Sequence, residues 1–249
     1  MGKLNLLCVL FLFLFFACET ATGPNEIGGD TNLDLTKVGS EFGVTIKLKD
    51  NNVAAFQAIK DSVFITKNDN GIVTFSGNFS IDFESLEKLD TVIGTSGLSD
   101  NMKHQLVDYF LTKYNATIDT SDKKDYKLYA ELKFKITSEG IQDFIHANND
   151  ISKPFTIVKY SSNVGDKYEF TKADGSKIIR TVVLKNPDED WDLAFWRVKT
   201  IRVEEVDAND PLISKLTYIT NHKYGLVGII IEFKDGRVIE TTVLPWNML

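Results

Sequence analysis

One short stretch of the sequence concentrates side chains that could bind a ligand. Four carboxylates and one indole stand in consecutive positions: Asp188, Glu189, Asp190, Trp191 and Asp192. Clustered carboxylates suit Ca²⁺, which takes about six to eight oxygen ligands, and an exposed indole could stack on the face of a sugar ring. The default interpretation is a solvated acidic turn that begins at Pro187, and the favoured place of the tryptophan is the end of a strand, where it caps the core.

Two further hypotheses involve the same carboxylates. Asp207, Asn209 and Asp210 could add ligands to an ion site if the two loops meet, although the spacing matches no known calcium loop. A pair of carboxylates facing each other in a cleft could instead flank a glycosidic bond and hydrolyse it.

The sequence otherwise lacks the short motifs of catalytic and nucleotide-binding sites. It contains no G-x-S-x-G elbow, no phosphate-binding loop and no H-E-x-x-H metal motif. His104, His146 and His222 are far apart in the sequence and lie among polar residues, which predicts solvated surface side chains rather than a metal site. We therefore predict no catalytic residue, no metal site and no cofactor.

The N-terminus has the layout of a secretory signal, with one cation followed by an apolar core. Lys3 precedes an apolar run over residues 4–17. As a helix at about 1.5 Å per residue the run would be roughly 21 Å long, which is less than the ~30 Å hydrocarbon core of a bilayer. A cleaved signal is therefore favoured over a permanent membrane span.

The run ends in a motif that resembles the lipobox of bacterial lipoproteins. Its residues are Phe15-Phe16-Ala17-Cys18: a bulky apolar residue, a tolerated position, a small residue and the cysteine. The resemblance covers residues 1–18 and implies cleavage before Cys18 and its acylation, with palmitate among the chains. It implies an exported protein held to a bacterial membrane by its N-terminal lipid, on the outer membrane or the cell surface in a Gram-negative cell. An ordinary cleaved signal is the alternative.

Cysteine usage agrees with this reading. Cys8 lies inside the signal, so cleavage would leave Cys18 as the one cysteine of the mature chain. A disulfide and a thiolate metal site would then be impossible, and the exported protein would depend on its hydrophobic core.

The composition divides the rest of the chain into three parts. Residues 18–37 carry Gly, Thr, Asn and Asp with few apolar residues, which predicts a flexible tether behind the signal peptide of residues 1–17. Residues 38–150 mix strand and helix patterns, and residues 151–249 are rich in strand patterns. These two parts are either subdomains or one domain over 38–249.

The first half alternates between strand and helix patterns. Residues 42–48 and 126–136 show the period of two that is typical of strands, and Asn70-Gly71 predicts a hairpin between residues 63–66 and 72–83. Helical spacing predicts a short helix near 85–89, a longer one over 100–114, and another that Ser138 caps, with Ile141, Phe144 and Ile145. Residues 53–59 fit a short helix or an irregular crossing.

The second half consists almost entirely of strand patterns. Two similar hairpins turn on Asp174-Gly175 and Asp235-Gly236, either through duplication or because such turns converge on one pattern. Between Trp191 and Val206 the apolar residues switch from one set of alternate positions to the other, which indicates a bulge or a strand buried on both faces. The chain as a whole predicts an α+β, strand-dominated fold with predominantly antiparallel sheets and a few helices in the first half.

The charge balance limits the partners. The net charge is −7, and loss of Lys3 with the signal would make it −8 (−7 − 1). An acidic chain disfavours nucleic acid and anionic membrane surfaces, whereas a protein or glycan partner remains open, as does the oligomeric state. The sequence thus predicts a non-catalytic binding or structural module of the cell envelope, with a carbohydrate- or ion-binding accessory protein and a glycoside-type hydrolase as alternatives.

Overall fold

The structure is a computed structural model that describes residues 26–48, 63–82, 108–109, 111–122 and 125–246. The signal peptide, Cys18 and the first part of the tether lie outside the described residues. So do residues 53–59, the expected short helix near 85–89 and most of the expected helix over 100–114. Residues 108–109 and 111–113 are helical, at the position of the C-terminal end of that longer helix.

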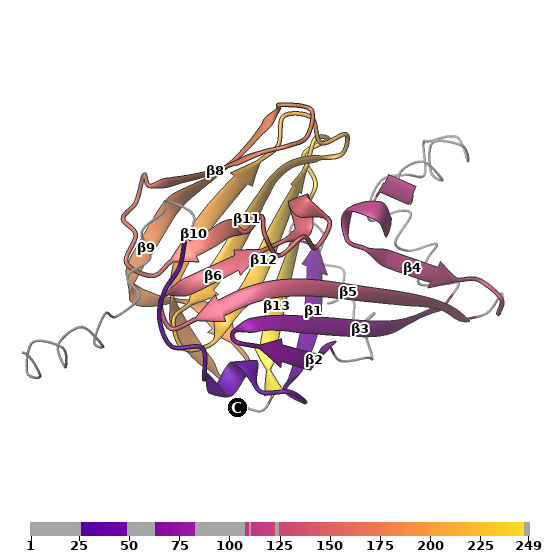
Figure 1. Cartoon of the computed structure of the whole chain (residues 1–249), viewed down its shortest axis with the longest axis horizontal. Helices are drawn as coiled ribbons and strands as arrows, with labels where there is room; N and C mark the ends of the chain where they lie inside the picture. Colours follow the sequence, from indigo (N-terminus) through magenta and orange to yellow (C-terminus); the bar gives the residue numbers. More distant parts are fainter. Residues whose placement is uncertain (1–25, 49–62, 83–107, 110, 123–124, 247–249) are drawn as a thin grey trace, which may run out of the picture.

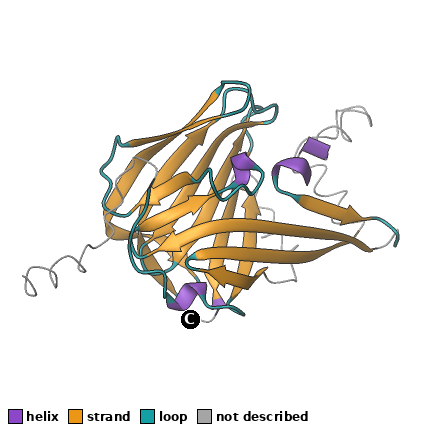
Figure 2. Cartoon of the chain, viewed as in Figure 1, coloured by secondary structure: helices purple, strands orange, loops and turns teal. Residues whose placement is uncertain are grey.

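In the described part of the chain, thirteen strands form one antiparallel sheet (Figures 1 and 2). Their order along the sheet is β7-β6-β5-β3-β2-β1-β13-β12-β11-β10-β9-β8, and β4 pairs with β5 off this path. The strands are β1 (Glu41–Leu48), β2 (Val63–Asp69), β3 (Ile72–Asp82), β4 (Ala116–Asp119), β5 (Asp125–Thr137), β6 (Gly140–Asp143), β7 (Phe155–Lys159), β8 (Lys167–Thr171), β9 (Lys177–Leu193), β10 (Trp196–Val206), β11 (Ile213–Asn221), β12 (Gly225–Phe233) and β13 (Val238–Pro245).

The sheet curls until its two end strands, β7 and β8, come close together, which gives a nearly closed, barrel-like shape (Figure 1). Side chains bridge these ends: the Tyr168 hydroxyl accepts a hydrogen bond from the Lys159 amide at 3.1 Å and shares one with Ser162 Oγ at 2.5 Å. The inward faces of the strands form the main core. Strands from both 38–150 and 151–249 contribute to this one sheet, because β6 pairs with β7 and β1 pairs with β13.

The strand-dominated, antiparallel expectation is confirmed, and the class is mostly all-β. The helices expected in the first half are not confirmed, because residues 83–107 lie outside the described part. Besides the helical turn near residue 110, the described residues contain two short 3-10 helices, η2 (Asp34–Thr36) and η4 (Ile145–Ala147).

The helix expected to begin at Ser138 is wrong. Thr137 pairs with Gly140 across a tight turn, and the chain continues as β6 before it reaches η4. All four residues of β6 are buried between β5 and β7. A strand that is buried on both faces loses the period of two, so the spacing of Ile141 and Phe144 resembled a helical stripe.

The predicted hairpins are confirmed at their turns. Asn70 and Gly71 join β2 to β3 with φ of 54° and 87°, which is the left-handed backbone that such a turn requires. Gly175 and Gly236 adopt φ of 83° and 89° between β8 and β9 and between β12 and β13. In each of these two turns the aspartate before the glycine accepts a hydrogen bond from the amide after it.

The parity change between Trp191 and Val206 has two causes. Register shifts occur in the β9–β10 pairing between Val198 and Ile201, so the expected irregularity is present. The larger cause is a turn at Ala194 and Phe195, which separates two strands where the pattern indicated one stretch. Ala194 adopts φ of 56° without being Gly, Asn or Asp, so the usual turn residues are absent.

Candidate functional site

The acidic stretch 188–192 lies within β9 rather than in a solvated turn, so that expectation is wrong. Pro187 and its neighbours continue the strand. Trp191 is only 6% exposed, and its Nε1 donates to the Val227 carbonyl at 3.2 Å. The indole is a core residue and is not available to stack on a sugar.

Two of the four carboxylates of this stretch, Asp190 and Asp192, have protein partners. Asp190 accepts hydrogen bonds from Thr200 Oγ1 at 2.9 Å and from Arg202 Nη2 at 2.8 Å. Asp192 forms an exposed ion pair with Arg197 at 3.0 Å. Among the described residues no group of three or more His, Cys, Asp or Glu side chains is placed to hold a metal ion.

Asp210, which the sequence offered as a further ion ligand, anchors the helical residues near 110 instead. Its Oδ2 accepts hydrogen bonds from Tyr109 at 3.0 Å and Lys113 at 2.7 Å, and its Oδ1 accepts from the amides of Leu212 and Ile213. Burial works to raise the pKa of Asp210, but these donors hold it below its ordinary value. Its oxygens are thus committed within the protein.

The two described histidines, His146 and His222, lie in different environments. His222 is exposed and His104 lies outside the described residues. The expectation of a surface side chain is wrong for His146, which is 7% exposed and lies 3.0 Å from Glu205 Oε1 through its Nε2. Its ring also contacts the rings of Phe155 and Phe170, because η4 folds back over the end of the core.

His146 belongs to a buried ionic cluster centred on Arg180, whose side chain is fully buried. Arg180 Nε donates to Glu205 Oε2 at 2.7 Å, and its Nη2 donates to the Tyr218 hydroxyl at 3.1 Å, which in turn donates to Glu205 at 2.9 Å. Asp143 Oδ2 lies 2.6 Å from Arg180 Nη2 as an ion pair without an aligned hydrogen bond. The guanidinium carbon lies 3.8 Å from the Phe155 ring centroid.

The electrostatics of the cluster favour its charged state. Burial opposes the charges, but the Asp143 and Glu205 carboxylates hold the pKa of Arg180 above its ordinary value. Burial likewise works to raise the pKa of Glu205, yet the Arg180 charge and the His146 hydrogen bond hold it well below its ordinary value. The Glu205 carboxylate therefore accepts from Arg180 and Tyr218 and lies within hydrogen-bond distance of His146 Nε2.

The position of the cluster explains its structural role. Arg180 Nη1 donates to the Phe155 carbonyl at 3.1 Å, which links β9 to β7 across the seam where the sheet nearly closes. Asp143 comes from β6, Glu205 from β10 and Tyr218 from β11. The guanidinium thus connects five strands, and its donors are used inside the core rather than offered to a ligand.

Sequence reasoning missed this cluster, although a signal was present. Ile178, Arg180 and Val182 alternate along β9, and all three are buried. The period of two therefore placed a charged residue on the inner face. A buried charge needs a partner, but the carboxylates that meet Arg180 are distant in sequence and could not be identified from it.

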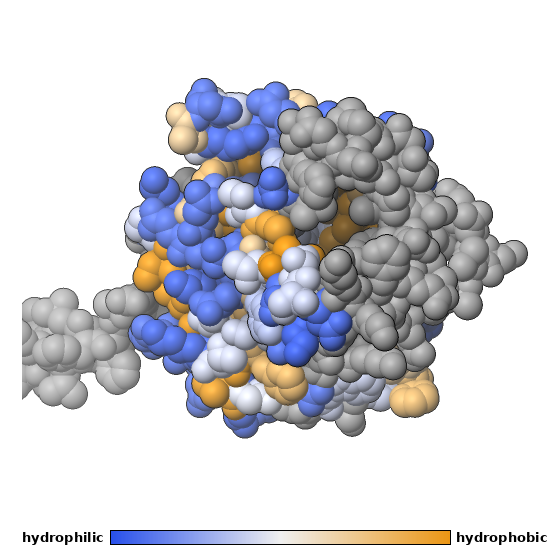
Figure 3. Space-filling view, turned by 90° about the vertical axis from the view of Figure 1, so that its right-hand side faces the viewer, coloured by the Kyte–Doolittle hydropathy of each residue, from blue (hydrophilic) through white to orange (hydrophobic). Residues whose placement is uncertain are grey.

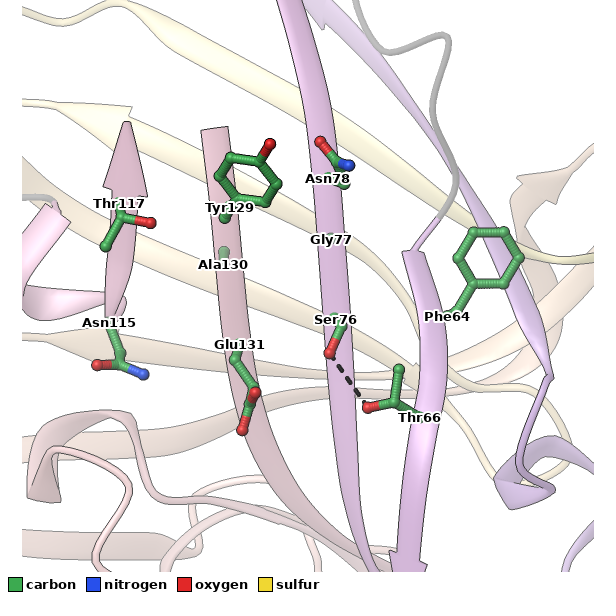
Figure 4. A pocket seen from close by; sticks show the side chains of 10 residues that line it. All are labelled: Phe64, Thr66, Ser76, Gly77, Asn78, Asn115, Thr117, Tyr129, Ala130 and Glu131. Carbon is green, nitrogen blue, oxygen red and sulfur yellow. Dashed lines mark hydrogen bonds between the residues drawn. The ribbon is translucent and has the colours of Figure 1, made fainter. Parts of the chain in front are cut away.

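An open groove lies elsewhere, on the outer face of β2, β3, β5 and β4. Its volume is about 740 Å³. Figure 4 shows the residues that line it, which are Phe64, Thr66, Ser76, Gly77, Asn78, Asn115, Thr117, Tyr129, Ala130 and Glu131. None of them was expected from the sequence to bind a ligand, because an outward polar residue on a half-buried strand is the ordinary pattern.

Two aromatic rings stand out in the groove, because Phe64 is 43% exposed and Tyr129 is 40% exposed. The strand between them, β3, presents Ser76 and Asn78, and Ser76 shares a hydrogen bond with Thr66 on β2 at 3.1 Å (Figure 4). In the space-filling view of one side, the described surface is mainly hydrophilic with scattered hydrophobic residues (Figure 3). Ligand sites combine aromatic or apolar surface with polar groups that orient the ligand, and both are present in this groove.

No known family matches the chain, and comparison with characterised proteins and with solved structures gave no match either. In the described residues, no helix has the length and apolar character needed to cross a membrane.

Proposed function

We propose that this protein is an exported, lipid-anchored binding module of the bacterial cell envelope, and that its ligand binds in the groove on β2, β3, β5 and β4. Acylated Cys18 holds the module to the membrane, and residues 19–37 connect the anchor to the sheet. The module binds without catalysing a reaction.

The observation that carries this proposal is the pairing of exposed aromatic rings with polar side chains in one open groove. A large exposed ring gains free energy when a ligand covers it, at about 25 cal/mol per Å² of apolar surface removed from water. Tyr129 and Phe64 lie on a sheet face where most neighbours are polar. Nearby hydroxyl and amide groups can then fix the orientation of the ligand.

The hydrolase alternative has less support from the described geometry. Among the described residues, Glu131 is the one carboxylate in the groove lining, whereas glycoside hydrolysis by the usual route needs two facing carboxylates. Asp143 and Glu205 do approach a common partner, but both are fully or almost fully buried and paired with Arg180. The groove is therefore better suited to holding a ligand than to cleaving it.

Photo-crosslinking in living cells tests the location of the site. Benzoylphenylalanine replaces Tyr129 in the groove or, as a matched control, Phe195 at the β9–β10 turn, which is 95% exposed. Both sites accept an aromatic side chain without disturbing the core. We expect an adduct from the Tyr129 position that the Phe195 position does not give. Identical adduct patterns, or no adduct from Tyr129, would refute a binding site in the groove.

A further inference from the structure

We infer that the ligand of the groove is a neutral glycan chain, recognised by aromatic stacking and by hydroxyl and amide side chains. This inference rests on the proposed function, because it names the ligand of the same site. Three features of the described groove carry it: its charge, its position on the sheet and the arrangement of its side chains.

The charge of the lining disfavours anionic ligands. The described lining contains no Lys, Arg or His, and Glu131 is its one ionisable acid. Phosphate, sulfate and carboxylate groups are recognised in proteins mainly by Arg and Lys donors or by clustered backbone amides. Lys127 and Lys133 flank Tyr129 and Glu131 on the outward face of β5, but neither lines the groove. An anionic ligand on the lining itself would contact Glu131, so a neutral ligand fits the lining better.

The position of the groove disfavours a peptide that adds to the sheet as a strand. Such peptides pair with free backbone groups at a sheet edge, whereas β3 is paired on both sides, with β2 and with β5. On its other edge β5 pairs with β4 and β6. Between the part of β5 that pairs with β4 and the part that pairs with β6, the Asn149 side chain accepts a hydrogen bond from the Lys133 amide and donates one to the Glu131 carbonyl, both at 3.3 Å. The backbone at the centre of the groove is therefore paired. Among the described residues β4 has no partner on its outer edge, so a peptide strand could add only beside the groove.

The side chains form two rows that run across the strands. The first row is Thr117 on β4, Tyr129 on β5 and Asn78 on β3, which are cross-strand partners. The second row, two residues along, is Glu131, Ser76 and Phe64. Strand spacing and rise place the two rings roughly 12 Å apart across the face. A sugar chain presents apolar ring faces bordered by hydroxyls, which matches two aromatic platforms separated by hydroxyl and amide groups.

The test is calorimetric titration of the full chain in detergent micelles with soluble oligomers of glucose, mannose and N-acetylglucosamine. An anionic oligogalacturonate and an uncharged peptide serve as contrasting probes. We expect saturable binding of at least one neutral oligosaccharide. Tyr129→Ala should weaken this binding about tenfold or more, whereas Tyr129→Phe, which keeps the platform, should stay within about threefold. Phe195→Ala, which removes an exposed ring outside the groove, should leave the affinity unchanged.

Other outcomes overturn the inference. Tighter binding of oligogalacturonate or the peptide than of every neutral sugar refutes it, as does equal binding by Tyr129→Ala and the unmodified protein. Failure of the glycan is distinguishable from failure of the groove. A protein adduct at the Tyr129 crosslinking position with no sugar binding would retain the site and reject the ligand class, whereas no adduct and no sugar binding would reject both.

Discussion

At the scale of single residues, Arg180 is the side chain on which the core most depends. Arg180→Met would keep the apolar stem but leave Asp143 and Glu205 buried without their cation. Removing one partner of a buried ion pair costs about 3–5 kcal/mol, and we expect a loss of that size in the free energy of unfolding, measured by urea denaturation.

Lys177→Met is the matched control for this substitution, since it lies on the same strand and forms an exposed ion pair with Glu169 at 2.8 Å. Exposed pairs contribute about 0–1 kcal/mol, so the control should change stability little. A loss of less than about 1 kcal/mol for Arg180→Met would show that the cluster is not an essential support of the core.

Glu205 gives the stability of the fold a pH dependence of defined sign. In the folded protein its pKa lies below the ordinary value of 4.5, so the folded state binds the proton less readily than the unfolded state. The resulting stabilisation is fully present above that value and is lost as the pH falls below it. We expect the free energy of unfolding to fall between pH 7 and pH 3.

Glu205→Gln separates this contribution from that of the other acids. The variant should be less stable at pH 7, and its stability should fall less steeply toward pH 3 than that of the unmodified protein. Parallel curves for the two proteins would assign the acid sensitivity to other carboxylates, such as Asp210, whose pKa is also lowered.

Individual residues also show how far the sequence predicted the interior. The alternation of Ile178, Arg180 and Val182 could have indicated an inner face, but a burial pattern says nothing about which distant side chain will meet Arg180. The favoured interpretation of Trp191, a residue at a strand end that caps the core, is confirmed, whereas the exposed indole beside the carboxylates is wrong. Only the β9–β10 pairing shows that Asp190 faces Arg202 while the indole turns inward.

At the scale of elements, turn chemistry was the most reliable guide. Asn-Gly and Asp-Gly supply left-handed backbone at low cost, so the hairpins at Gly71, Gly175 and Gly236 could be predicted from two residues each. The turn at Ala194 carries no such signal. The prediction for the residues that form β6 was wrong for a different reason. Burial on both faces removes the period of two from which strands are recognised.

A substitution at Gly140 tests how closely β6 packs against β7. A Cβ at this position would lie 2.3 Å from the Val158 carbonyl oxygen, which is backbone of the paired strand β7 and cannot rotate away. Overpacking of this kind typically costs about 1–3 kcal/mol. We expect Gly140→Ala to lower the midpoint of urea denaturation by a corresponding amount.

Gly43→Ala provides the comparison for Gly140. There the new Cβ would meet the side chain of Trp246, 2.6 Å away, which is 48% exposed and free to move outward. The loss at Gly43 should therefore be clearly smaller. Equal losses at both positions would contradict the close approach of β6 and β7.

At the scale of the whole molecule, the sheet closes where backbone pairing ends. β7 and β8 occupy the two ends of the strand order, and the seam is bridged by Tyr168 and Arg180 rather than by a backbone ladder. The sequence could predict many antiparallel strands, because tight turns imply antiparallel neighbours. It could not predict the closure or the outer groove, since both depend on long-range pairing such as that of β1 with β13.

In the proposed function, Cys18 carries the lipid that attaches the whole molecule to the membrane. Cys18→Ser should block both acylation and the lipoprotein-type cleavage, because the acyl chains need the thiol and stable anchoring needs more than one chain. Cys8→Ser, which changes a cysteine inside the signal, is the matched control and should leave processing intact. The measurement is mass spectrometry of the mature N-terminal peptide, where we expect an acylated Cys18 in the unmodified protein and in the control alone. An unmodified peptide that begins at Glu19 or later, or an intact Met1, would reject the lipid anchor.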